Sequence, residues 1–297
     1  MRVGLIGIGA MGFAMAARLR DGGWSVAVRD IDAQREAAAL ALGARVCATP
    51  AELAAQSDVV VVAVVDAAQT HEVLFGDHGA ASALAAGAAV MLCPTIAPGD
   101  VESTERALAA RGLATLDAPM SGGPLRARAG TMSLMVACTD AVFGRHAALL
   151  HALADPVFRV GTRPGDGART KLVNNLLAAA NLAGAAEAMA LASRLGLEPA
   201  NTLRVIGASS GQSWIGDDRM KRALAGDEAV KARAALLAKD SGLALALARD
   251  VRLPTPVGEA AHAAFQRAVR AGLGDADDAV LYRLALNPGA DGSADAP

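Results

Sequence analysis

A run of small apolar residues at positions 59–65, Val-Val-Val-Val-Ala-Val-Val, is the feature that most constrains the fold of this chain. A strand with one face in water alternates apolar and polar residues, and this run has no polar position. Such a pattern is typical of a parallel strand that helices cover on both faces. The sequence therefore predicts a central strand of an α/β sheet at this point.

The N-terminal half of the chain alternates strand and helix patterns, and the rest reads as helices. Further β-rich runs lie at residues 2–6, 25–29, 45–47, 89–93, 114–117, 133–137 and 157–160. Helical patterns lie at residues 11–21, 33–42, 50–55, 171–195, 199–206, 219–224, 230–249, 256–271 and 276–286. We expect a doubly wound Rossmann-type parallel sheet domain at 1–162, an all-α domain with a long inter-domain helix at 163–288, and a flexible tail at 289–297.

The turn between the first expected strand and the first expected helix carries a G-x-G-x-x-G pattern. It consists of Gly7, Ile8, Gly9, Ala10, Met11 and Gly12. In this context the first glycine allows a tight turn, the second lets the backbone approach a pyrophosphate, and the third permits close helix–sheet packing. The N-terminus of the helix then offers amide groups to the anion. The pattern predicts dinucleotide binding.

An acidic residue at the end of the second expected strand bears on the choice of dinucleotide. Asp30 lies 21 residues after Gly9. A carboxylate at that place accepts hydrogen bonds from the ribose hydroxyls and repels a 2′-phosphate, which favours NAD. Arg29 and Arg35 flank it and either could reach a phosphate, so NADP stays open.

The charge and the aromatic content of the chain limit the classes of molecule that it can bind. Lys and Arg total 28 against 30 Asp and Glu, and aromatic residues are only 3%. Such a chain has neither the positive field nor the stacking platforms that nucleic acids require, so we expect a small-molecule partner.

Three widely spaced cysteines indicate buried thiols in a reducing compartment. The apolar stretch at 176–192 is interrupted by Asn181 and Glu187, which favours a buried helix over a membrane span, and we expect a cytoplasmic protein.

Three other patterns are interpreted as structural. Residues 207–211 match G-x-S-x-G but lie between helices, where no strand-to-helix elbow is expected. His71 begins a zinc-protease-like pattern that lacks its second histidine. His146 and His151 have no acidic or cysteine neighbours, so we expect surface or capping roles and no metal site.

Several segments in order, from residue 1 to about 286, resemble the β-hydroxyacid dehydrogenases. This family includes 3-hydroxyisobutyrate, tartronate-semialdehyde and 6-phosphogluconate dehydrogenases. The segments are residues 7–16, 94–96, 117–123, 171–175 and 239–240. Residues 73–76, 187–192, 213–214, 253–254 and 277–280 are similar to the L-threonate dehydrogenase branch. The resemblance implies a nicotinamide-dependent oxidoreductase with a C-terminal substrate and dimerisation domain.

The resemblance also implies the catalytic residues. Lys171 would be the general acid/base, Asn175 would bind the reacting oxygen from the same helical face, and Ser121 with Gly122 and Gly123 would form a cradle for the substrate carboxylate. We expect Lys171 in the first turn of its helix, where the positive helix end and partial burial would lower its pKa toward that of a working base.

Further binding residues follow from the same resemblance. Thr95 would lie near the nicotinamide, as expected for a residue just past the carboxyl end of a strand. Cofactor-binding residues beyond the glycine turn would be Val65, Asp66, Lys239 and Asp240. Substrate-binding residues beyond the cradle would be Arg126 and Trp214. A cation at 126, as in the threonate branch, favours a polar or doubly anionic substrate.

The expected function is hydride transfer between NAD, or NADP, and a small hydroxy acid. Candidate substrates are a sugar acid such as L-threonate, a 3-hydroxy acid or tartronate semialdehyde. The alternatives are an imine reductase-like enzyme and a catalytically silent dinucleotide-binding protein of the same fold. The long apolar helix indicates that a further surface is buried in an assembly, and we expect a homodimer or homotetramer.

Overall fold

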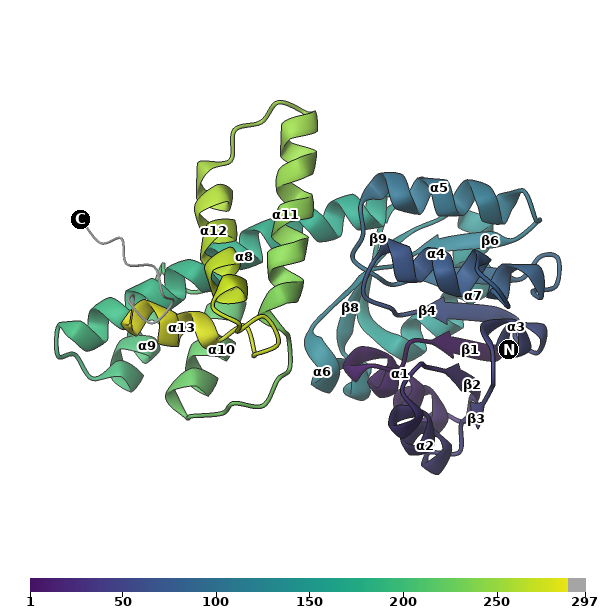
Figure 1. Cartoon of the computed structure of the whole chain (residues 1–297), viewed down its shortest axis with the longest axis horizontal. Coiled ribbons are helices and arrows are strands. Elements are labelled where there is room, and N and C mark those ends of the chain that lie inside the picture. Colours follow the sequence, from purple (N-terminus) through teal and green to yellow (C-terminus); the bar gives the residue numbers. More distant parts are fainter. Residues whose placement is uncertain (288–297) are drawn as a thin grey trace. The chain divides into compact units, whose positions relative to one another are not determined.

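The computed structural model describes residues 1–287, so the tail expected at 289–297 lies outside the described residues. The chain forms two compact units, residues 1–171 and residues from 172 onward. The division falls inside helix α8 (Asp166–Arg194), beyond the boundary expected after residue 162. Figure 1 shows the first unit as strands flanked by helices and the second as helices.

The first unit contains a nine-stranded sheet in the order β3-β2-β1-β4-β5-β6-β8-β7, with β9 paired to β8. Its strands are β1 (Arg2–Ile6), β2 (Ser25–Arg29), β3 (Arg45–Val46), β4 (Val59–Val62), β5 (Ala89–Leu92), β6 (Ala114–Asp117), β7 (Met120–Ser121), β8 (Met132–Ala137) and β9 (Ala154–Gly161). From β3 to β6 all neighbours are parallel, which confirms the Rossmann-type core.

The far edge of the sheet differs from the expected parallel arrangement. β8 runs antiparallel to both β6 and β7. The chain continues in the direction of β6 through β7 and then reverses at Gly122 and Gly123, whose φ angles are +127° and +74°. β7 has only two residues and follows β6 without a helix between them. The alternation of strand and helix patterns in the sequence therefore did not indicate it.

Helices cover both faces of this sheet. They are α1 (Ala10–Asp21), α2 (Ala33–Ala41), α3 (Pro50–Ala55), α4 (Ala67–Phe75), α5 (Pro98–Ala109), α6 (Gly123–Ala129) and α7 (Asp140–Leu153), with a 3₁₀ turn at Ala80–Ser82. Val59 and Val61 belong to one hydrophobic core and Val60 and Val62 to the other. All four are fully buried, which confirms a strand covered on both sides for the first four residues of the run. Residues 63–65 lie beyond the strand, and Val65 is exposed.

The second unit is built from the greater part of α8 together with α9 (Pro199–Gly207), α10 (Trp214–Leu224), α11 (Ala234–Asp250), α12 (Pro256–Arg270) and α13 (Val280–Leu286). Its core gathers Leu182 and Met189 of α8, Met220 of α10 and Phe265 of α12. Within residues 172–287 the only β pairing is an isolated bridge between Arg233 and Asp277. The expected all-helical unit is thus confirmed.

Helix α8 is long and apolar enough to cross a membrane by length and composition, and it is the one helix in residues 1–287 that passes this test. Leu182, Ala186 and Met189 on its inner face pack into the core of the second unit. Its outer face exposes the large apolar side chains of Val173, Leu177 and Leu191, and Leu195 is exposed directly after the helix ends.

Two expectations about individual side chains have different outcomes. The cysteines are free and buried, as expected. The expected surface or capping role of His146 is wrong, because the side chain is 2% exposed and neither ring nitrogen has a hydrogen-bond partner. It lies on the face of α7 that also buries Leu149 and Leu150, a position that five-residue spacing to His151 could not reveal.

Candidate active site

The glycine turn between β1 and α1 has the geometry that the sequence predicts. Gly7 has a φ of +87°, and a Cβ at Gly12 would lie 2.0 Å from the carbonyl oxygen of Gly7. At Gly9 only the Arg35 Nη1 would come within 4 Å of an added Cβ. Because Gly9 also begins α1 without a capping side chain, the first amides of the helix remain able to bind an anion. The turn therefore fits a dinucleotide pyrophosphate.

Asp30 lies at the end of β2 and is 7% exposed. Its Oδ2 accepts a hydrogen bond of 2.6 Å from the backbone N–H of Ile8, and its Oδ1 accepts one of 2.9 Å from the backbone N–H of Asp32. The carboxylate therefore braces the glycine turn. Each carboxylate oxygen has a second lone pair, so bonds to ribose hydroxyls remain available.

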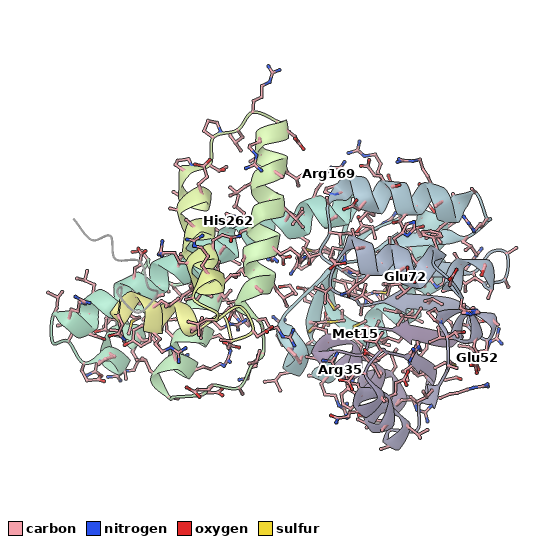
Figure 2. The ribbon with its side chains drawn as sticks, viewed as in Figure 1. Met15, Arg35, Glu52, Glu72, Arg169 and His262 are labelled. Carbon is pink, nitrogen blue, oxygen red and sulfur yellow. The ribbon has the colours of Figure 1, made fainter. Side chains whose placement is uncertain are left out.

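The two arginines near Asp30 differ in how free their guanidinium groups are to contact a cofactor phosphate. The Arg29 Nη1 pairs with the Glu36 carboxylate at 2.7 Å. Arg35, labelled in Figure 2, is about half exposed, with Nη1 4.0 Å from Asp30 and Nε 3.3 Å from Asp32. Arg35 is thus the cation beside the glycine turn.

The carboxyl ends of β4 and β5 carry the other expected cofactor residues of this unit. Val65 is exposed, and the Asp66 Oδ1 caps α4 by accepting a hydrogen bond of 2.8 Å from the backbone N–H of Gln69. Thr95 is partly buried just beyond β5. β1 and β4 are neighbours in the sheet, which is the switch point where this fold binds dinucleotides.

The expected carboxylate cradle lies where the chain reverses after β7. Both glycines have positive φ angles, and the φ of +127° at Gly122 is one that residues with a side chain rarely adopt. A Cβ at Gly122 would lie 3.1 Å from the Arg126 Cδ, which places that side chain beside the loop. The Arg126 Nε donates a hydrogen bond of 2.8 Å to the carbonyl of Thr131. Ser121, Gly122, Gly123 and Arg126 are thus brought together.

Lys171 is 8% exposed and lies on α8, but its expected place in the first turn is wrong. The helix begins at Asp166, so Lys171 is its sixth residue. The field of a helix terminus acts mainly within the first turn, and Lys171 lies beyond it. Asp117 holds this helix start by accepting hydrogen bonds from the backbone N–H of Gly165, just before the helix, and of Ala168 in its first turn, contacts that the turn-like sequence at 163–167 concealed.

Asn175 lies one turn after Lys171 on the same helix and is 7% exposed. Its Nδ2 donates a hydrogen bond of 2.6 Å to the Asp240 Oδ2, and the Lys239 Nζ lies 2.7 Å from the Asp240 Oδ1. The Asn175 Oδ1 accepts a hydrogen bond of 3.0 Å from Asn174. These contacts fix the orientation of the Asn175 amide. The sequence had not indicated that Asp240 contacts Asn175.

Trp214 begins α10 and is half exposed, with the Arg219 guanidinium 6.0 Å from its ring centre. Arg219 also pairs with Asp278 at 2.6 Å inside the second unit. This neighbourhood is structural, and the expected substrate contact of Trp214 stays a prediction. Within residues 1–287 no three acidic, histidine or cysteine side chains are grouped to hold a metal ion.

The fold and the glycine turn together define the class of dinucleotide-binding oxidoreductases. Residues 2–161 match the family model described as the NAD binding domain of 6-phosphogluconate dehydrogenase. Residues 165–285 match the model described as NAD-binding of NADP-dependent 3-hydroxyisobutyrate dehydrogenase.

Full-length relatives narrow this class. An L-threonate dehydrogenase of Cupriavidus necator is 39% identical over 282 residues, covering 95% of each chain. A 2-(hydroxymethyl)glutarate dehydrogenase of Eubacterium barkeri is 33% identical, covering 96% of this chain and 94% of the relative. A crystal structure described as 3-hydroxyisobutyrate dehydrogenase from Salmonella typhimurium has a TM-score of 0.89 at 36% identity, covering 96% of this chain and 99% of that chain. The chain belongs to the β-hydroxyacid dehydrogenase family and is an NAD(P)-dependent hydroxy acid oxidoreductase.

Proposed function

We propose that this protein oxidises a short, polar hydroxy acid such as L-threonate, with Lys171 as the general acid/base. The observation that carries the proposal is the pair formed by Lys171 and Asn175, both buried and one turn apart on α8. Asn175 is held by Asp240, which leaves its second Nδ2 hydrogen for a substrate oxygen.

Each part of the site has a distinct task in this reaction. Bound nicotinamide would accept the hydride from the substrate carbon. Lys171 would take the hydroxyl proton, and the Asn175 amide would hold the reacting oxygen in line. The amides of the loop at 121–123 and the Ser121 hydroxyl would bind the substrate carboxylate. This contact would orient the reacting carbon toward the nicotinamide.

The substrate class is inferred from the loop at 121–123. Arg126 lies against Gly122, so a guanidinium is close to the proposed carboxylate site. A substrate with further hydroxyl or carboxylate groups gains from such a neighbour, whereas the methyl group of an isobutyrate does not. A sugar acid or a dianionic hydroxy acid therefore fits better than 3-hydroxyisobutyrate.

NAD is proposed as the preferred cofactor because Asp30 is held at the end of β2. Its buried carboxylate would accept bonds from the ribose and repel a 2′-phosphate. Arg35 beside the turn reduces this preference, so NADP remains a second substrate. Val65, Asp66, Thr95 and Lys239 are proposed to complete the cofactor site.

We also propose a cytoplasmic homodimer or homotetramer. The support is the outer face of α8, where Val173 and Leu177 are 70% and 62% exposed. Large apolar side chains in such a row are typical of a protein interface. Light scattering on the purified protein tests the assembly, and a monomer at micromolar concentration would contradict it.

The function is tested by following reduced nicotinamide with NAD and NADP across hydroxy acids of three to six carbons. Lys171→Met should lower kcat at least about a hundredfold, the scale of lost acid–base catalysis, while NADH still binds. Lys221→Met is the matched control, because it makes the same substitution at an exposed lysine of α10 whose ammonium pairs with Asp217. Full turnover in Lys171→Met would contradict the mechanism, activity on cyclic imines alone would indicate an imine reductase, and a flat screen with tight NADH binding would indicate a silent binding protein.

A further inference from the structure

The first unit holds a buried carboxylate that the proposed reaction does not use. Asp117 ends β6 and is 1% exposed. Its Oδ2 accepts hydrogen bonds from the backbone N–H of Gly165 at 2.8 Å and of Ala168 at 3.2 Å. Gly165 directly precedes α8, and Ala168 lies in its first turn. One side chain therefore joins the end of a sheet strand to the beginning of the helix that carries Lys171.

The backbone at the start of α8 is shaped for this contact. A Cβ at Gly167 would lie 2.8 Å from the Asp117 Cγ, which is closer than any real Cβ contact. Gly165 has a φ of +93°, a conformation that favours glycine. Two glycines thus allow the helix backbone to approach the carboxylate more closely than other residues would permit.

Asp117 is connected to two segments of the proposed site. Along the chain it precedes Ser121 by four residues, and the intervening Ala118 is fixed by a 2.8 Å backbone hydrogen bond to Leu92 of β5. Through its hydrogen bonds it holds the first turn of α8, and Lys171 lies in the next turn. A helix is stiff over this length, so a displacement of its first turn is carried to Lys171.

We infer that Asp117 is a positioning residue: its ionised carboxylate sets the place of Lys171 relative to the loop at 121–123. The inference rests on the proposed role of Lys171 as acid/base. Amide donors favour the charged form of a carboxyl group, so protonation weakens the bonds that hold the helix start. The proposal thus predicts that turnover depends on the ionisation of this one group.

The surroundings of Asp117 place its titration within an accessible range. Burial raises the pKa of its carboxyl to about 6, against the lowering effect of the amide donors. Burial raises the pKa of the Cys93 and Cys138 thiols, and the charge of Asp117 raises it further, so both thiols stay neutral across this range. Asp166 raises the Asp117 pKa further and is itself paired with Arg163 at 3.1 Å.

The test compares three variants in kcat, NADH affinity and the kcat–pH profile between pH 5 and 9. Asp117→Asn should lower kcat about 10- to 100-fold, the scale for a misplaced reacting group, and should remove the contribution of the Asp117 carboxyl to the acid limb that we expect for the parent near pH 6. Gly167→Ala, whose Cβ would lie 2.8 Å from both the Asp117 carboxylate and the Met135 carbonyl oxygen, pushes the helix start away from the sheet end with the carboxylate intact and should reproduce the loss of kcat. Gly144→Ala lies on α7 of the same unit with nothing within 4 Å of its added Cβ, and should keep the parent kcat.

NADH affinity should stay within about twofold of the parent in all three variants, because the glycine turn is untouched. Parental kcat and an unchanged acid limb in Asp117→Asn would overturn the inference, as would a lower melting temperature with parental kcat and pH profile. If Asp117→Asn does not fold, Gly167→Ala carries the test. If the parent has no hydroxy acid turnover, the proposed function fails instead, and faster amide exchange at residues 165–168 in Asp117→Asn still reports whether the carboxylate holds the helix.

Discussion

Removing the Asp240 carboxylate should damage catalysis more than cofactor binding. Asp240 and Asn175 are each 7% exposed, and a hydrogen bond of 2.6 Å joins them. A buried hydrogen bond to a charged group contributes about 1.5–3 kcal/mol. If this entire free energy serves to hold the Asn175 amide in the transition state, loss of the Asp240 carboxylate lowers kcat about 10- to 150-fold.

Two substitutions separate positioning from cofactor contact. Asp240→Leu removes both acceptor oxygens, whereas Asp240→Asn keeps one oxygen that can accept from Asn175 and should lose less activity. Ser241→Ala is the matched control, since Ser241 is the next residue of α11, fully buried and bonded to the Leu237 carbonyl. Its kcat should equal that of the parent.

The assay is steady-state kinetics with NAD varied, together with NADH titration by fluorescence and thermal unfolding. The reasoning predicts a lower kcat with the NADH dissociation constant within about twofold of the parent. A rise in that constant as large as the fall in kcat would show that Asp240 acts on the cofactor, as its family resemblance implies. Parental kcat in Asp240→Leu would refute any role in the reaction.

Two further predictions concern the cofactor and acid stability. Asp30→Ser should raise kcat/KM for NADP relative to NAD, because the carboxylate that repels a 2′-phosphate is removed; equal use of both cofactors by the parent would contradict this. Burial lowers the pKa of His146, so the unfolded chain binds the proton more readily and the protein loses stability as pH falls below about 6.5, by at most about 1.4 kcal/mol per pH unit. Urea unfolding between pH 5 and 8 should therefore show a flatter profile for His146→Leu than for the parent, with the exposed His151→Leu as control; identical slopes in all three proteins would contradict the burial argument.

The sequence determined the features that depend on neighbours along the chain. The glycine turn and the strand before it follow from spacing alone, because the φ angle of Gly7 and the close approach at Gly12 are local requirements. The valine run indicated burial on both faces, since an apolar strand without alternation leaves no face for water. The reversing loop at 122–123 was visible as consecutive glycines, although the short strand before it was not.

The tertiary structure decided what depends on residues far apart in the chain. Asp117 meets Gly165 across 48 positions and moves the start of α8 ahead of the place expected from its turn-like sequence. Asn175 meets Asp240 across 65 positions, which turns an expected cofactor residue into a partner of the proposed catalytic amide. Hydrogen bonds of this kind leave no periodic mark in a sequence, because side-chain type and spacing report only the local backbone and its burial. Which carboxylate holds which helix is fixed only when the strands and helices pack.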